Sequence, residues 1–184
     1  MKMNQNGAFS TRDIVYTGMF VVMIAICSWI SIPTSVPFTL QTFAVFMAVL
    51  VLGGKRGTLA VIVYLFLGAA GGPVFAGFTG GFGILAGTTG GYLLGFILTA
   101  AIMWLMEPAG RSRPWIRILS MLTGLLACYM VGTIWFMAVY GRNTGSISVL
   151  TALGWCVFPF VIPDLIKIGL AYTISPVLRK AIAE

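Results

Sequence analysis

Long apolar stretches dominate the pattern of hydrophobic and polar positions, and the few charged residues separate them. No charged residue lies between Asp13 and Lys55, or between Gly57 and Met106. A helix that crosses a membrane needs about 20 predominantly apolar residues, and each of these stretches has room for two helices. With the segments that follow, the pattern predicts six transmembrane helices, approximately at residues 13–32, 39–53, 58–70, 90–106, 117–139 and 163–179.

The segments between these helices are rich in proline, glycine or charge. A short surface helix is expected from Ser146 to Trp155. The last transmembrane helix is then expected to start near Pro163, because proline is well tolerated in a first helical turn. The main loops are expected at 33–42 (outer, proline-containing), 71–90 (outer, glycine-rich) and 107–117 (polar).

Composition places the chain among integral membrane proteins. Hydrophobic residues make up 59% of the 184 residues, charged residues 8%, and the mean hydropathy is +1.03. A soluble domain carries about a quarter charged residues, so this chain lacks the polar side chains to cover a surface in water. Strands of a membrane barrel alternate polar and apolar positions, whereas these stretches are continuously apolar. We therefore expect an all-α integral membrane protein with a single transmembrane domain over residues 1–184.

The reactive side chains argue against catalysis. The chain has no histidine, which removes the commonest metal ligand and general base. Cys27, Cys128 and Cys156 lie far apart in or beside apolar stretches, without the spacing of a metal site or a disulfide framework. We expect no enzymatic activity, no catalytic residue, no metal site and no cofactor.

The basic residues predict the orientation in the membrane. With six spans, both termini share one side with Lys2, Arg12, Lys55, Arg56, Arg111, Arg113, Arg117, Arg179 and Lys180, whereas the other side holds only Arg142. An excess of Lys and Arg marks the cytoplasmic side. Both termini are therefore expected in the cytoplasm, in a multi-pass protein of a bacterial-type cytoplasmic (inner or plasma) membrane. The net charge of +7 suits the anionic headgroups of the lipid bilayer and needs no nucleic acid as a partner.

Two charged residues fall inside a predicted span. Asp164 and Lys167 lie three residues apart in the last apolar stretch, so on a helix they share one face, toward the outer half of the membrane. Ionisable residues inside a span usually face a cavity or a partner, and this pair suits a polar ligand that enters from outside. The alternative is an internal Asp–Lys bridge that only stabilises the last helix of a structural membrane subunit.

The glycine-rich loop supplies further candidate residues. Phe75, Phe78 and Tyr92 lie in or next to it and are candidates for the apolar walls of a small-molecule pocket. Glycine lets the backbone approach a ligand closely. The alternative is that the glycines only allow close packing of helices.

The first outer loop carries polar side chains next to an aromatic one. Thr39, Gln41 and Thr42 follow Phe38, and Gln41 enters the membrane at the level of Asp164. We expect Gln41 to complete a polar cluster with the charged pair. The alternative is that hydroxyl groups and prolines only mark the boundary of a span.

Four segments together resemble the BioY family, the biotin-binding S components of energy-coupling factor (ECF) transporters. They are ISIPTSVPFTLQTFAV (30–45), LGGKRG (52–57), LGAAGGPVFAGFTGGFGILAGTTGGYLLGF (67–96) and FVIPDLIK (160–167). Their order and separations also agree, and the resemblance extends from about residue 13 to residue 180. It implies a six-helix S component that binds biotin near the outer face. The ECF coupling transmembrane subunit and two cytoplasmic ATPase subunits would then help to deliver biotin inward.

The resemblance also implies roles for residues. It places Asp164 and Lys167 in the biotin site and makes the 33–42 loop a gate. The ureido ring of biotin offers N–H donors and a carbonyl acceptor, its bicyclic body requires apolar walls, and its valerate is anionic. Whether Lys167 meets the valerate or the ureido side stays open. An S component for another small vitamin is the alternative.

The sequence departs from the S-component pattern in the first helix. S components commonly dock on the coupling subunit through an Ala-x-x-x-Ala strip. The matching positions are Gly18 and Val22, of which only the first is small. The docking surface is expected at these two positions on a weakened motif, and a mode of transport without a coupling module stays open.

Overall fold

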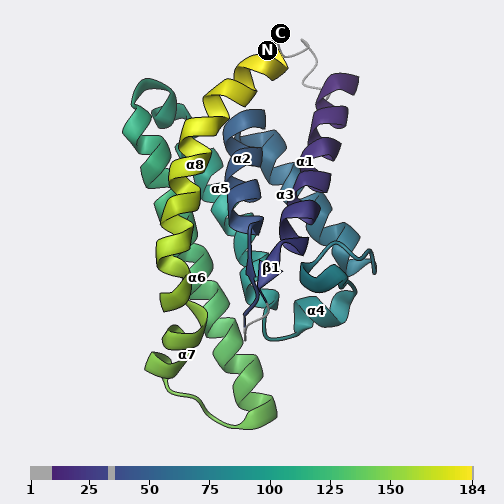
Figure 1. The fold of residues 1–184 in the computed structure, drawn as a ribbon, viewed down its shortest axis with the longest axis vertical. Coiled ribbons are helices and arrows are strands. Elements are labelled where there is room, and N and C mark those ends of the chain that lie inside the picture. Colours follow the sequence, from purple (N-terminus) through teal and green to yellow (C-terminus); the bar gives the residue numbers. More distant parts are fainter. Residues whose placement is uncertain (1–9, 33–35, 184) are drawn as a thin grey trace.

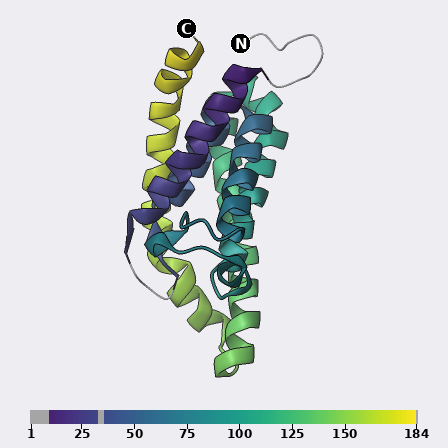
Figure 2. The ribbon, with the colours of Figure 1, turned by 90° about the vertical axis from the view of Figure 1, so that its right-hand side faces the viewer.

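The structure is a computed structural model that describes residues 10–32 and 36–183. Six long helices form an elongated bundle (Figures 1 and 2), namely α1 (Thr11–Trp29), α2 (Gln41–Leu52), α3 (Gly54–Ala69), α5 (Gly90–Ser112), α6 (Pro114–Thr144) and α8 (Phe158–Ala183). Shorter elements connect them, namely the strands β1 (Ser31–Ile32) and β2 (Phe38–Thr39), the 3-10 helix η1 (Ala76–Phe78), α4 (Phe82–Ala86) and α7 (Val149–Cys156). The predicted all-helical class is confirmed.

Four of the described helices, α1, α5, α6 and α8, are long and apolar enough to cross a membrane. The other two long helices are short; compared with the expected ranges 39–53 and 58–70, α2 is shorter and α3 is longer. With 12 residues in α2 and 16 in α3, a rise of 1.5 Å per residue makes them about 18 and 24 Å long. The hydrocarbon core of a bilayer is about 30 Å thick, so neither of these two helices spans it alone.

Several helix boundaries differ from those expected, for local reasons. α6 continues past residue 139 and through Gly141 to Thr144, and it ends at Gly145, whose φ of +108° is not helical. α8 begins at Phe158 and continues through Pro163, where the expected start was. Neighbouring helices tolerate such a proline within a membrane-embedded helix.

The first outer loop, expected at 33–42, forms a hairpin around residues 33–35, which lie outside the described residues. β1 and β2 pair antiparallel, with Ser31 opposite Thr39 and Ile32 opposite Phe38. This pairing ends α1 at Trp29 and delays the start of α2 to Gln41. The hairpin therefore takes residues from both expected helices.

Gly53 alone connects α2 and α3, where the sequence suggested a longer turn. Its φ of +86° lies in the region that favours glycine. The early start of α3 places Arg56 on a helix, and its guanidinium lies 2.9 Å from the Asp13 carboxylate of α1. Asp13 is buried, so this ion pair between α1 and α3 is shielded from solvent.

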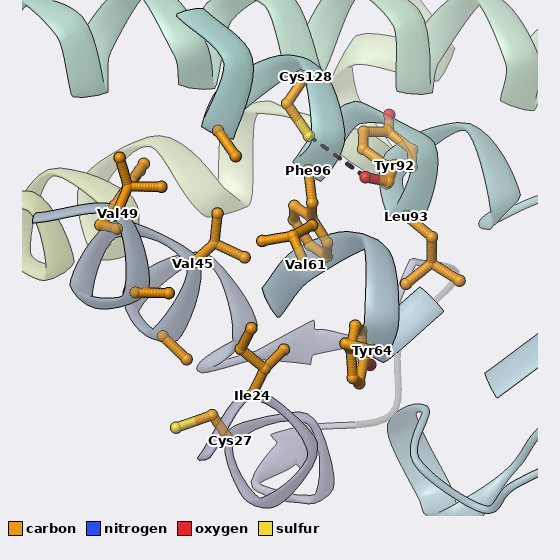
Figure 3. Packing of buried hydrophobic residues seen from close by; sticks show 14 of the residues in the cluster. Ile24, Cys27, Val45, Val49, Val61, Tyr64, Tyr92, Leu93, Phe96 and Cys128 are labelled. Carbon is orange, nitrogen blue, oxygen red and sulfur yellow. Dashed lines mark hydrogen bonds between the residues drawn. The ribbon is translucent and has the colours of Figure 1, made fainter. Parts of the chain in front are cut away.

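The core fills the space between the six long helices. Figure 3 shows Ile24, Val45, Val61 and Phe96 converging from four of these helices. The most extensive helix–helix contact is between α5 and α6, where the Sγ atom of Cys128 lies against the backbone of α5 and 3.5 Å from the carbonyl oxygen of Tyr92. Glycines of α5 and α6 permit this approach, so part of the glycine-rich sequence serves helix packing, as the alternative interpretation proposed.

The two ends of the bundle differ in charge. α1 begins and α8 ends at one end, called here the terminal end, which also holds the α2–α3 and α5–α6 connections (Figure 1). The described basic residues other than Arg142 and Lys167 lie in or beside these segments. The opposite, distal end holds the β-hairpin, η1, α4 and α7, and Arg142 lies in the last turn of α6 there.

The close approach of α2 and α3 predicts a large effect of a single methyl group. A Cβ atom at Gly57 would lie 2.5 Å from the Cα atom of Val49 and 2.8 Å from the carbonyl carbon of Ala48. Because these are backbone atoms, no rotamer change relieves the overlap. We expect Gly57→Ala to lower the free energy of unfolding by about 1–3 kcal/mol, measured by thermal unfolding of the purified protein in detergent.

Gly141→Ala is the matched control, because a Cβ atom at Gly141 on α6 meets nothing within 4 Å. Alanine favours a helix over glycine, so this variant should melt at or slightly above the wild-type temperature. Equal melting temperatures of the two variants would contradict the packing argument.

Candidate functional site

The distal half of the bundle encloses a cavity of about 290 Å³. Residues of the β-hairpin, α2, α5, α6, α7 and α8 line it, together with the glycine-rich segment. Its volume is close to the lower end of the roughly 300–1,000 Å³ typical of small-molecule pockets. Segments far apart in the sequence therefore meet around a space suited to one small ligand.

Asp164 of α8 is the most buried charged residue of the cavity wall, with 2% of its surface exposed. Its Oδ1 atom accepts hydrogen bonds from Lys167 at 2.7 Å and from the Thr42 hydroxyl at 2.9 Å. Its Oδ2 atom accepts a hydrogen bond from the Tyr129 hydroxyl at 2.5 Å. Three helices, α2, α6 and α8, therefore supply hydrogen-bond donors to one carboxylate.

Lys167 uses its ammonium group to connect α8 with the first outer loop. Besides Asp164, the Nζ atom donates to the carbonyl oxygen of Thr39 at 2.6 Å and to the Thr42 hydroxyl at 3.1 Å. It also lies 4.4 Å from the centre of the Phe38 ring, within the range of a cation–π interaction. An ammonium group has three hydrogens, so each has an acceptor.

Gln41 extends the polar cluster toward α3. Its Oε1 atom accepts a hydrogen bond from the Thr39 hydroxyl at 2.9 Å, and its Nε2 atom donates to the Tyr64 hydroxyl at 2.6 Å. The Tyr64 hydroxyl in turn donates to the carbonyl oxygen of Val74 at 3.1 Å. A glutamine amide has two hydrogens, and the second has no partner among the described residues.

Aromatic side chains form much of the apolar wall. Phe75 and Tyr92 both line the cavity; the Phe75 ring meets Tyr64 edge to face at 5.6 Å, and the Tyr92 hydroxyl shares a hydrogen bond of 2.9 Å with Thr133. Phe160 lines the cavity as well. These contacts fix the rings and give the cavity a rigid apolar side.

Two of the aromatic candidates do not line the cavity. Phe38 packs behind the wall, with its ring 5.8 Å from that of Phe160. Phe78 is 64% exposed and stacks on Trp29 of α1 at 4.8 Å. The indole nitrogen of Trp29 also donates to the carbonyl oxygen of Pro73 at 2.9 Å. Phe78 therefore attaches the glycine-rich segment to α1.

Gly18 and Val22 lie on the outer face of α1, away from the cavity. Val22 is 56% exposed, and a Cβ atom at Gly18 would meet nothing within 4 Å. Met19 and Ile26 are exposed on the same helix. The two residues thus belong to an apolar surface that the described part of the chain leaves uncovered.

Sequence reasoning missed Tyr129 as a partner of Asp164. The only signal available was a hydroxyl-bearing side chain inside the apolar stretch of α6. The contribution of Cys128 and Cys156 to the lining was missed as well, because both thiols were interpreted as ordinary buried residues. The helical period shows which residues share a face, but it does not show which helix that face meets.

The arrangement suits binding of a small molecule with a polar head and an apolar body. The Asp164 carboxylate accepts hydrogen bonds, the Gln41 amide donates, and Lys167 supplies a positive charge, all opposite aromatic rings. Among the described residues, no group of three or more His, Cys, Asp or Glu side chains lies together as metal ligands would.

Comparisons with known proteins agree with this geometry. The sequence model of the BioY family matches residues 2–184. The biotin transporter BioY of Thermotoga maritima is 42% identical over 94% of this chain and 99% of its own length. The probable biotin transporter BioY of Pyrococcus horikoshii is 38% identical over 91% of this chain and 96% of its own length.

A solved structure is also similar in fold. It is a crystal structure of the S-component for biotin from an ECF-type ABC transporter. It superposes with a TM-score of 0.82 and 28% sequence identity, over 97% of this chain and 95% of that chain. The similarity therefore includes the helices around the cavity.

The buried ion pair predicts a specific pattern of stability. Lys167→Met would leave the Asp164 carboxylate buried without its counter-ion, and we expect a loss of about 3–5 kcal/mol in the free energy of unfolding. The double variant Asp164→Asn/Lys167→Met removes both charges and keeps an acceptor for Tyr129, so it should recover most of that loss. Denaturant unfolding in detergent measures both values.

Arg111→Met is the control, because it removes one partner of an exposed ion pair with Glu107. Exposed pairs contribute about 0–1 kcal/mol, so this variant should stay close to wild type. A double variant no more stable than Lys167→Met alone would show that the buried charge is not the cause.

Proposed function

This chain belongs to the BioY family, and from that membership we infer that it takes up biotin across the cytoplasmic membrane as the substrate-binding S component of an ECF-type transporter. It is a membrane transport protein and not an enzyme. The observation that carries the proposal is the buried pair of Asp164 and Lys167 in the wall of the 290 Å³ cavity.

Biotin matches the chemistry of the cavity wall. Its ureido ring has two N–H groups, and the Asp164 carboxylate has about one acceptor site left for one of them. The ureido carbonyl group suits the second amide hydrogen of Gln41. Its bicyclic body suits the walls formed by Phe75 and Tyr92. The anionic valerate needs a positive charge, and Lys167 supplies one inside the cavity.

Lys167 also connects ligand binding with the outer loop. All three of its hydrogens have acceptors, one of them the carbonyl oxygen of Thr39 in β2. A ligand anion that binds the ammonium group has to replace one of these acceptors. Release of Thr39 would free the hairpin from α8, which supports a gate role for residues 33–42.

The transporter arrangement extends to orientation and location. We place the six long helices in a bacterial-type cytoplasmic membrane, with the short α2 and α3 packed against the longer ones and the terminal end in the cytoplasm. The clustering of basic residues at the terminal end supports this orientation, because Lys and Arg accumulate on the cytoplasmic side. Biotin then enters from the distal end, where the cavity lies.

Transport requires partners that this chain does not supply. It carries no nucleotide-binding motif, so ATP is used by two ATPase subunits that act through an ECF coupling transmembrane subunit. The exposed face of α1 around Gly18 and Val22 is the proposed docking surface for the coupling subunit. Since Gly18 leaves space above the helix, a partner helix is able to approach the backbone there.

The site predicts how substitutions change biotin affinity. Loss of a hydrogen bond to a buried charge costs about 2–5 kcal/mol of binding. We therefore expect Asp164→Asn and Lys167→Met to bind biotin on the order of 100-fold more weakly than wild type. Equilibrium binding of radiolabelled biotin to the purified protein measures the change, and Glu107→Gln, an identical type of change at the terminal end, should bind like wild type.

Other outcomes identify the alternatives. Wild-type binding by both site variants would show that the site is elsewhere. If the wild-type protein does not bind biotin but binds another small vitamin, biotin is not its substrate and the proposed architecture stays intact. A protein that binds no vitamin and only loses stability in both variants would be a structural membrane subunit with an internal ion pair.

The proposed orientation predicts labelling from one side only. Thr144 is exposed at the distal end of α6, and Ser112 is exposed at the terminal end of α5. The native cysteines Cys27, Cys128 and Cys156 are buried. A membrane-impermeant maleimide should label Thr144→Cys in intact cells, and Ser112→Cys only after lysis. The reverse pattern would place the termini outside the cell.

A further inference from the structure

A second cleft opens at the terminal end, between α2, α5, α6 and α8. We propose that it binds the phosphate headgroup of an anionic phospholipid. The inference requires only that the chain lies in a bilayer, and it does not depend on biotin as the substrate. No residue of α1 lines the cleft, and α6 and α8, which do line it, lie on the opposite side of α2 from α1 (Figure 1), so the cleft is separate from the proposed docking surface.

The cleft has an excess of positive charge. Arg111, Arg117 and Arg179 line it together with one carboxylate, that of Glu107, so the formal charge of the lining is +2. Glu107 is already engaged, because its Oε1 atom accepts from Arg111 at 2.9 Å and its Oε2 atom accepts from the backbone N–H of Gly54 at 2.8 Å.

Two of the arginines have no directly paired carboxylate among the described residues. Asp13, Glu107 and Asp164 each pair with another cation, and none of the described carboxylates forms an ion pair with Arg117 or Arg179. The Nε atom of Arg117 donates to the carbonyl oxygen of Gly110 at 2.9 Å, which positions its guanidinium along the cleft. The remaining N–H groups of a guanidinium suit phosphate oxygens.

The hydroxyl group of Ser175 supplies a third donor. Ser175 of α8 lines the cleft and is 7% exposed. Its hydroxyl has no hydrogen-bond partner among the described residues, although most helical Ser and Thr side chains here donate to a carbonyl of the preceding turn. Among the described residues, only Thr58 has a fully buried hydroxyl without a partner, so the Ser175 oxygen keeps some exposure. An oxygen atom of a ligand in the cleft would accept a hydrogen bond from the Ser175 hydroxyl.

The size of the cleft fits a phosphate group and not a whole lipid. Its volume is about 40 Å³, and a water-sized group needs roughly 10–15 Å³ of such volume, so it admits about three oxygen atoms. Leu50, Met103 and Pro176 supply apolar surface beside the arginines. The glycerol and acyl chains therefore lie outside the cleft, along the apolar faces of the helices.

The level of the cleft along the bundle agrees with a headgroup region. Trp115, in the first turn of α6, is 58% exposed, and exposed tryptophans concentrate at membrane interfaces. Basic pockets between helices on the cytoplasmic side bind anionic headgroups. From Lys167 in the cavity to Ser175 in the cleft, α8 rises about 12 Å, so the two sites are separate.

Lipid binding to the delipidated, purified protein in detergent tests the proposal. Fluorescent phosphatidylglycerol should bind wild type more tightly than phosphatidylcholine, whose headgroup carries its own positive charge. The variant Arg117→Gln/Arg179→Gln should bind phosphatidylglycerol at least about tenfold more weakly, and Ser175→Ala should bind it more weakly by a smaller factor. Lys180→Gln is the matched control, because it removes a charge from the neighbouring position on α8 and does not line the cleft.

The outcomes distinguish a lipid bound in the cleft from general surface charge and from free phosphate. The control removes one charge and the double variant removes two, so equal losses of affinity per charge removed would reduce the effect to surface charge and overturn the site. Displacement of phosphatidylglycerol by millimolar inorganic phosphate would identify free phosphate as the occupant and overturn the lipid. Helix content by circular dichroism checks that each variant is folded, independently of whether wild type binds biotin.

Discussion

The hydrogen-bonded ion pair of Asp164 and Lys167 constrains the whole distal half of the bundle. A charge inside an apolar bundle is tolerated only when it is paired and its remaining hydrogen-bonding capacity is satisfied. The partners come from α2, α6, α8 and the strand β2, so these four elements must meet at one point. The cavity beside the pair follows from that requirement, because the polar groups hold the helices around it instead of letting them close.

The protein separates two kinds of electrostatics along its length. At the distal end, opposite charges are buried and neutralise each other beside a cavity. At the terminal end, arginine and lysine are in excess, and in the proposed orientation they meet headgroups and water. This separation gives the bundle a direction in the membrane and places the ligand site and the cleft around Arg117 and Arg179 at opposite ends of α8.

The glycine-rich sequence has two structural roles at once. Before residue 90 it forms the irregular segment with η1 and α4, which places Phe75 in the cavity wall and Phe78 on Trp29. From Gly90 onward it lies in α5, where Gly91 and Gly95 let α6 approach the backbone. Both interpretations of the glycines were therefore partly right, each for a different part of the segment.

Much of this protein could be predicted from its sequence, because a membrane acts as an apolar solvent. Continuous apolar stretches in such a solvent must be helical, rare charges mark the ends of helices, and a spacing of three residues puts Asp164 and Lys167 on one face. The tertiary structure decided which side chains that face meets. The packing of whole helices decides which side chains come together. It makes Tyr129 a partner of Asp164, turns Phe78 outward, and places Arg117 and Arg179 in one cleft. That packing is set by contacts between residues distant in the sequence, which the period of a single helix does not contain.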